Sequence, residues 1–106
     1  MRVGRPGDPR TVLLSALVDT GADLSVVPQG LPVRLGLPAV GRVAVAGVGS
    51  VSRPLPLYAV EVSINEYRTI IRAVSLGTTP LLGRDLLNKI TVNLDGPKAF
   101  LQVDFP

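Results

Sequence analysis

The sequence predicts an all-β fold, and its length and composition support this class. Hydrophobic residues make up 46% of the 106 residues, but aromatic residues make up only 4%. Val, Leu, Ile and Ala therefore fill the core, and β-branched residues favour strands. The 11 glycines and 10 prolines divide the chain into short segments, as strands joined by sharp turns require. The length fits a single domain over residues 1–106, and limited burial at this size makes an oligomer expected.

The N-terminal half is predicted to contain three strands and one helical turn. The turn Gly7–Arg10 joins a short first strand to a strand over Thr11–Val18, which is apolar on both faces, as in a buried central strand. A glycine-containing loop with the sequence DTGAD follows at 19–23, and Leu24–Val27 forms the next strand. The segment 31–38 holds one helical turn before its glycine and second proline end it.

The C-terminal half is predicted to consist mainly of hairpins. A glycine-rich tip with the sequence AGVGS lies at 46–50. Strands over Leu57–Ile64 and Tyr67–Val74 flank an Asn-Glu pair, which suits a tight turn. Apolar residues spaced by four predict one short helix over 84–90. A last hairpin covers 91–103, so strands dominate this half as well.

The missing residue types exclude several kinds of chemistry. The chain has no cysteine and no histidine. This excludes disulfides, Ser-His and Cys-His nucleophilic mechanisms and most zinc sites. Any acid–base catalysis must therefore use carboxylates, Lys, Arg or Tyr.

The basic charge indicates no particular partner. The net charge is +3 and the pI is near 10, but the 11 basic residues are scattered along the chain. A nucleic-acid site is expected to have clustered basic residues, so no nucleic-acid partner is expected. The alternative interpretation, suggested by the high pI, is a basic β-barrel that binds nucleic acid. The sequence shows no signal peptide and no membrane-spanning run, which predicts a cytoplasmic protein or domain without a membrane partner.

Two segments suggest a functional site. The stretch LVDTGADLSVVP at 17–28 places Asp19 inside an apolar run. A buried carboxylate without a partner is costly, so Asp19 must either be paired or take part in chemistry; alternatively, D-T-G is only a turn. The second segment is LLGRDLL at 81–87, which lies about sixty residues further along the chain.

The order ALVDTGADLSVVP, glycine-rich tip, LLGRDLL resembles the retropepsin-like, or retroviral-type, aspartic proteases from Val12 to Leu94. The resemblance implies a closed β-barrel that forms half of an acid protease, with one short C-terminal helix, and a homodimer. It implies an aspartic endopeptidase that hydrolyses polypeptide substrates with a water activated between two Asp19 carboxylates. The glycine-rich tip would be a flap that closes over the substrate. No metal and no organic cofactor are implied.

The resemblance also implies a role for each matching residue. Asp19 is the catalytic aspartate, Thr20 ties the two D-T-G loops across the dimer, and the backbone of Gly21 contacts the peptide. Asp23 forms a bidentate, mostly buried ion pair with Arg84 that stabilises the fold; the alternative is a surface pair that contributes little. The expected substrate-binding residues are Ala22, Asp23, Val26, Ala46, Gly47, Val48, Gly49 and Leu81.

The sequence departs from the family in three respects. Asp85 replaces a common asparagine, the turn before G-R-D is shorter, and the N-terminal dimer strand looks short or absent. We therefore expect the hairpin that runs through Asp95 to Val103 to supply the dimer sheet. Asp85 and Lys89, four residues apart, are interpreted as a solvated pair on the helix surface. The alternative function is a catalytically silent module of the same fold that binds peptides or dimerises.

Overall fold

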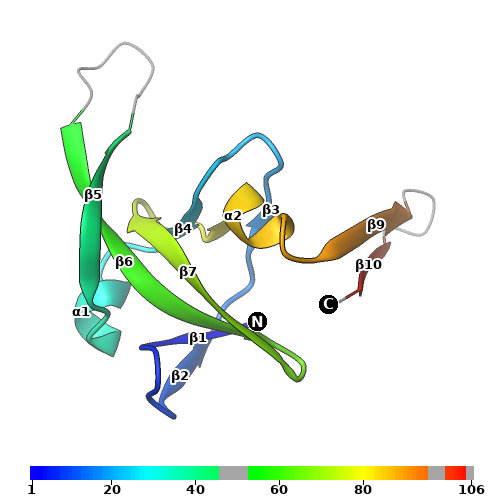
Figure 1. Cartoon of the computed structure of the whole chain (residues 1–106), viewed down its shortest axis with the longest axis horizontal. Coiled ribbons are helices and arrows are strands. Elements are labelled where there is room, and N and C mark those ends of the chain that lie inside the picture. Colours follow the sequence, from blue (N-terminus) through cyan, green and yellow to red (C-terminus); the bar gives the residue numbers. More distant parts are fainter. Residues whose placement is uncertain (46–52, 96–99, 105–106) are drawn as a thin grey trace.

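The structure is a computed structural model that describes residues 1–45, 53–95 and 100–104 (Figure 1). The described elements are β1 (Arg2–Gly4), β2 (Thr11–Leu13), β3 (Leu17–Val18), β4 (Ser25–Val27), α1 (Leu31–Leu35), β5 (Ala39–Val45), β6 (Arg53–Ile64), β7 (Tyr67–Ser75), β8 (Leu81–Leu82), α2 (Arg84–Leu87), β9 (Thr91–Asp95) and β10 (Phe100–Asp104). The predicted all-β class is confirmed. Two short helices are present where the fold class implied one.

Eight of the strands form one curled sheet in the order β2-β1-β6-β7-β4-β8-β3, with β5 paired to β6. The end strands β2 and β3 are separated by only residues 14–16 of the chain. Six strand spacings of about 4.8 Å would hold the ends of a flat sheet about 29 Å apart, whereas the chain from Leu13 to Leu17 spans at most about 14 Å. The sheet must therefore curl into a half-barrel whose two ends are joined by the chain.

The central hairpin of the sheet is the one predicted around the Asn-Glu pair at 65–66. β6 and β7 pair antiparallel from Tyr58↔Ala73 to Ile64↔Tyr67. Asn65, in the tight turn, has a positive φ of 54°, a conformation that asparagine adopts more readily than most residues. Inward-facing residues on both strands are buried, and the hairpin turns at the Asn-Glu pair from which it was predicted.

The core lies inside the curl of the sheet. Leu86 of α2 is completely buried there, and Leu31 of α1 is nearly so. The buried cluster contains Val3, Val27, Leu31, Leu37, Val60, Val62, Ile71, Ala73, Leu82 and Leu86. Both helices are short because turns follow them at once: Gly36 ends α1 in a left-handed conformation, and Asn88 caps α2. The helix predicted over 84–90 is therefore shorter than expected.

The predicted buried central strand over Thr11–Val18 is wrong. The segment divides into β2 and β3, which lie at opposite ends of the sheet path. Leu13 and Leu17 are 68% and 62% exposed. An apolar run on both faces does not distinguish a central strand from two short edge strands whose side chains are uncovered in a single chain.

The last two strands form a separate unit. β9 and β10 pair antiparallel over their full length, as predicted, and within the described residues they form their own two-stranded sheet. Figure 1 shows this hairpin extending to one side of the curled sheet. Neither described helix is long and apolar enough to cross a membrane.

Candidate active site

The D-T-G loop and the G-R-D segment meet at one end of the curled sheet. β8 lies between β3 and β4, with Val18 opposite Leu82 in a parallel pair and Val26 opposite Leu81 in an antiparallel pair. The loop at 19–24 connects β3 to β4 and therefore crosses the end of β8. Two motifs that are far apart in the sequence thus become direct neighbours.

Backbone hydrogen bonds fasten the loop to this segment. The N–H of Asp19 donates to the carbonyl oxygen of Leu82 at 2.9 Å, and the N–H of Arg84 donates to that of Ala22 at 2.8 Å. A Cβ atom on Gly83 would lie 2.6 Å from the backbone carbon and oxygen of Leu24. Glycine is therefore needed at the first position of G-R-D because the loop packs on its backbone.

Asp19 lies half-buried at the start of the loop. Its Oδ1 accepts a hydrogen bond from the N–H of Gly21 at 3.0 Å. A Cβ atom on Gly21 would lie 3.3 Å from the same oxygen, so glycine keeps the space beside the carboxylate open. Thr20 and Gly21 are exposed. One chain thus presents one partly exposed carboxylate, which is held by a hydrogen bond within its own loop. The exposed residues Thr20 and Gly21 follow it directly.

A buried hydrogen-bond network involves Asp85, contrary to prediction. Asp85 Oδ1 accepts the hydroxyl of Ser25 at 2.6 Å, and Oδ2 accepts the backbone N–H of Ser25 at 3.2 Å. Ser25 Oγ in turn accepts the N–H of Gly83 at 3.0 Å. Lys89, the expected partner of Asp85, instead donates to Thr69 and Ile70. A helix of four residues has no extended solvent face on which the predicted pair could form.

The predicted Asp23–Arg84 ion pair is present but not in the expected environment. Arg84 contacts Asp23 through one nitrogen and one oxygen. The side chains are 80% exposed for Asp23 and 52% exposed for Arg84, so the expected buried, bidentate pair is wrong. An exposed ion pair of this kind stabilises a fold only slightly. The buried contact between the two motifs is made by Ser25 and Asp85.

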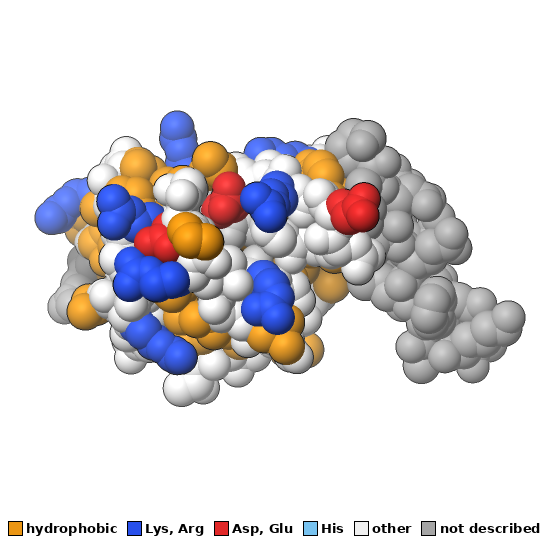
Figure 2. All heavy atoms as spheres, turned by 90° about the horizontal axis from the view of Figure 1, so that it is seen from below, with side chains coloured by type: hydrophobic (Ala, Val, Ile, Leu, Met, Phe, Trp, Pro, Cys, Tyr) orange, Lys and Arg blue, Asp and Glu red, His pale blue; other side chains and the backbone are white. Residues whose placement is uncertain are grey.

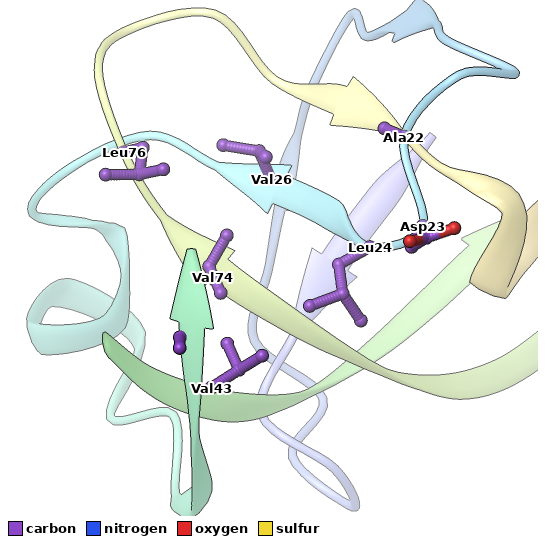
Figure 3. A pocket seen from close by; sticks show the side chains of 8 residues that line it. Ala22, Asp23, Leu24, Val26, Val43, Val74 and Leu76 are labelled. Atoms are coloured by element: carbon purple, nitrogen blue, oxygen red, sulfur yellow. The ribbon is translucent and has the colours of Figure 1, made fainter. Parts of the chain in front are cut away.

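A pocket of about 530 Å³ lies beside the loop. Figure 3 shows Ala22 and Asp23 at one end of it and Leu76 at the other. The lining residues are Ala22, Asp23, Leu24, Val26, Val43, Ala44, Val74 and Leu76. Ala22, Asp23 and Val26 were predicted from the sequence to bind substrate, and the other five were not. Leu24 belongs to the loop before β4, whereas the pairing of distant strands brings in Val43 and Ala44 from β5, Val74 from β7 and Leu76 from just after β7. The pocket is mostly apolar and suits hydrophobic side chains.

The other predicted site residues are placed differently. Leu81 lies in β8 and does not line this pocket. Ala46, Gly47, Val48 and Gly49, the predicted flap residues, lie outside the described residues. The two strands that lead to them, β5 and β6, pair up to Val45↔Arg53. Among the residues that the structure describes, no three acidic side chains gather as metal ligands.

The sequence was compared with known protein families and with curated proteins. The model of the retroviral aspartyl protease family matches residues 4–95. The match includes the D-T-G loop, the G-R-D segment and the strands that join them. No curated protein matches the chain significantly.

Proposed function

Because this chain belongs to the retroviral aspartyl protease family, we propose that it is an aspartic endopeptidase that acts as a homodimer. The observation that carries the proposal is the position of Asp19. Its carboxylate lies in a loop that is bonded to the G-R-D segment, next to an apolar pocket. This arrangement holds a carboxylate beside a surface that suits peptide side chains.

The reaction would require two chains, because D-T-G occurs once in the sequence. A twofold axis would place two Asp19 carboxylates side by side. Two carboxylates in contact do not both ionise easily, so they share one proton. The ionised carboxylate takes a proton from a water, which attacks the peptide carbonyl carbon, and the protonated one donates to the carbonyl oxygen, so that a tetrahedral diol forms. The newly protonated carboxyl then gives its proton to the peptide nitrogen and the C–N bond breaks. The other carboxylate takes a proton from one hydroxyl of the diol, which leaves a carboxylic acid, a free amine and a carboxylate pair that again holds one proton.

Two features of the single chain support a dimer. Leu17 and Val18, directly before Asp19, are 62% and 40% exposed, which leaves an apolar surface next to the proposed catalytic residue. The hairpin of β9 and β10 pairs with no other strand among those described, and an isolated two-stranded hairpin is marginally stable in water. A second copy of the chain would provide a partner for both.

Deletion of residues 95–106 tests the role proposed for this hairpin. We expect the dimer to weaken strongly, as measured by sedimentation equilibrium of both proteins. An unchanged dimer would show that other surfaces hold the two chains together.

The pocket supports a preference for hydrophobic residues near the cleaved bond. Leu24, Val43 and Val74 contribute aliphatic side chains to it, and Asp23 contributes a carboxylate at one end. An extended peptide would lie across the loop with its alternate side chains directed toward the pocket. Polar backbone groups of the peptide would remain available for hydrogen bonds with the loop.

The proposal is tested by comparing the protein with its Asp19→Asn variant. Both are incubated with a mixed peptide library from acidic to neutral pH, and products are identified by mass spectrometry. We expect the parent to cleave next to hydrophobic residues and the variant to be inactive, with both folded and dimeric. Equal cleavage by both proteins would indicate a contaminant. No cleavage by an intact dimer would favour the silent peptide-binding module.

A second candidate function is the binding of a polyanion such as nucleic acid. The sheet register places Arg2 and Arg68 on either side of Ser63, and Arg72 follows on the same outer face of β7. These arginines are exposed, and Figure 2 shows several basic side chains gathered on one side of the molecule, with acidic and apolar ones between them. Salt-sensitive binding of single-stranded DNA, lost on Arg68→Gln with Arg72→Gln, would support this function.

A further inference from the structure

The peptide group between Leu82 and Gly83 is bonded at both ends. Its carbonyl oxygen accepts the N–H of Asp19 at 2.9 Å. Its N–H donates to Ser25 Oγ at 3.0 Å. Because a peptide group is planar, these two bonds are made by one rigid unit. Any rotation of this plane that breaks the bond to Ser25 also moves the oxygen that holds the backbone of Asp19.

Asp85 fixes the direction of the Ser25 bond. A serine hydroxyl has one proton to donate and lone pairs to accept with. The hydroxyl donates this proton in a hydrogen bond to Asp85 Oδ1 at 2.6 Å, which leaves the lone pairs of Ser25 Oγ to accept the N–H of Gly83. Asp85 is itself held because Leu86 N–H donates to the same Oδ1 at 2.8 Å. Ser25 is only 2% exposed, so water does not compete for these bonds.

The glycine makes this arrangement necessary. A Cβ atom on Gly83 would lie within 2.9 Å of the backbone of Ala22 and Leu24, so no side chain is tolerated there. Without a Cβ atom, the plane on the Leu82 side of Gly83 is less restricted by steric contacts. Its orientation must come from hydrogen bonds, and Ser25 supplies the one on its N–H side.

We propose that Asp85 is a positioning residue for the catalytic loop. It acts through Ser25 and the Leu82–Gly83 peptide group on the backbone of Asp19. The inference rests on the proposed protease function, since it concerns how Asp19 is held for catalysis. A displacement of about 1 Å at a reacting group can lower a rate by about a hundredfold, so a loosened Asp19 is expected to lower kcat.

The test compares Asp85→Ala, Asp85→Asn and Ser25→Ala with the parent protein. An asparagine oxygen still accepts the Ser25 hydroxyl, whereas alanine removes the acceptor and Ser25→Ala removes the link itself. The matched control is Lys89→Gln, which breaks hydrogen bonds between the end of the same helix and β7. Two quantities are measured on folded dimer: kcat and KM for a cleaved peptide, and hydrogen exchange at the Asp19 amide by NMR.

We expect Asp85→Ala and Ser25→Ala to lower kcat at least about tenfold with KM nearly unchanged, because the loss lies in the geometry of the reacting group. The Asp19 amide should exchange faster in these two variants. Asp85→Asn and Lys89→Gln should keep most of the kcat and the slow exchange. Should Asp85→Ala fail to fold, Ser25→Ala carries the same test because Asp85 remains in place.

Equal kcat and equal amide exchange in all variants would overturn the proposal. A loss in Asp85→Asn as large as that in Asp85→Ala would overturn the route through the Ser25 hydroxyl. If the parent itself cleaves nothing, the amide exchange alone decides. Faster exchange in the two alanine variants supports the proposed connection from Asp85 through Ser25 to the backbone of Asp19, and unchanged exchange refutes it. Absence of cleavage by the parent counts only against the protease function.

Discussion

Besides their backbone hydrogen bonds, the D-T-G loop region and the G-R-D segment are linked by two contacts that involve side chains, and these two differ in almost every respect. One is the ion pair of Asp23 and Arg84, in which both side chains are exposed to solvent. The other is the set of hydrogen bonds among Ser25, Asp85 and Gly83, which is buried at Ser25. The comparison teaches that opposite formal charges in two motifs are a weak guide to stability. The buried contact matters more because its loss would leave polar groups without partners and without water.

The largest effect is expected at Gly83, where both contacts depend on close approach of the two segments. Gly83→Ala would place a Cβ atom 2.6 Å from the backbone of Leu24, and backbone cannot move aside as a flexible side chain can. The backbone at Gly83 is extended, with φ −93°, so the cost comes from space alone. We expect the free energy of unfolding to fall by about 3 kcal/mol. Urea unfolding followed by circular dichroism, at fixed protein concentration, measures it.

Gly41→Ala is the matched control for this substitution. Its added Cβ atom would lie 3.8 Å from a side-chain atom of Leu57, which is an ordinary contact. We expect a change near zero or a slight stabilisation, because alanine restricts the unfolded chain. If Gly83→Ala were as stable as Gly41→Ala, close packing of the two segments at Gly83 would not be needed for stability. The buried contact would then not be the main link between them.

The second effect concerns Asp85. Asp85→Ala removes the acceptor of the Ser25 hydroxyl and of the Ser25 N–H, and leaves both buried. We expect a loss of about 2 kcal/mol in the free energy of unfolding. Asp85→Asn keeps one acceptor oxygen and should lose less. The same urea measurement on the three proteins checks the order, and an alanine variant as stable as the parent would contradict it.

The sequence predicted local structure better than long-range contacts. The hairpin of β6 and β7 was predicted because its two strands and the asparagine-containing turn between them lie within one short stretch. The break between β2 and β3 was missed because β3 is defined by pairing with β8, more than sixty residues away. No pattern within Thr11–Val18 contains that information.

The candidate site shows the same limit. Asp19 and its loop were identified because the whole motif is contiguous in sequence. The Ser25–Asp85 contact was missed because Asp85 was paired with the nearest opposite charge along the helix. A signal did exist: Ser25 is a polar residue inside the apolar run Leu24–Val27, and a buried serine needs a partner. That partner lies sixty residues away, and the sequence alone does not name it.

A smaller effect is expected for the exposed contact. Arg84→Gln should lower the free energy of unfolding by about 0–1 kcal/mol, since water replaces the lost interaction. The same holds for Asp23→Asn, and the double variant gives the coupling energy between them. Added salt should reduce that coupling further. A coupling energy larger than the loss in Asp85→Ala would reverse the comparison and restore the ion pair as the main link.

The last comparison is with a third acidic residue, Asp8, which forms a local ion pair with Arg10 and whose contribution is expected to depend on pH. Arg10 donates to Asp8 from its guanidinium and from its backbone N–H, across a turn of two residues. The side-chain hydrogen bond from Arg10, then its backbone hydrogen bond, lowers the pKa of Asp8 from 3.8 to about 2. Asp8 differs from Asp23 in this respect: its side chain is only 17% exposed, and a backbone donor holds it in place.

A lowered pKa in the folded state gives a defined pH dependence. The stabilisation from ionised Asp8 is complete above the ordinary carboxyl pKa and is lost as the pH falls from about 4 toward 2, where the folded state takes up the proton. Asp8→Asn should therefore lower Tm at neutral pH, and the difference from the parent should shrink over that acidic range. Thermal unfolding of both proteins across pH measures it. A difference that stays constant down to pH 2 would mean that the carboxylate charge contributes nothing and that the backbone hydrogen bond alone holds the turn.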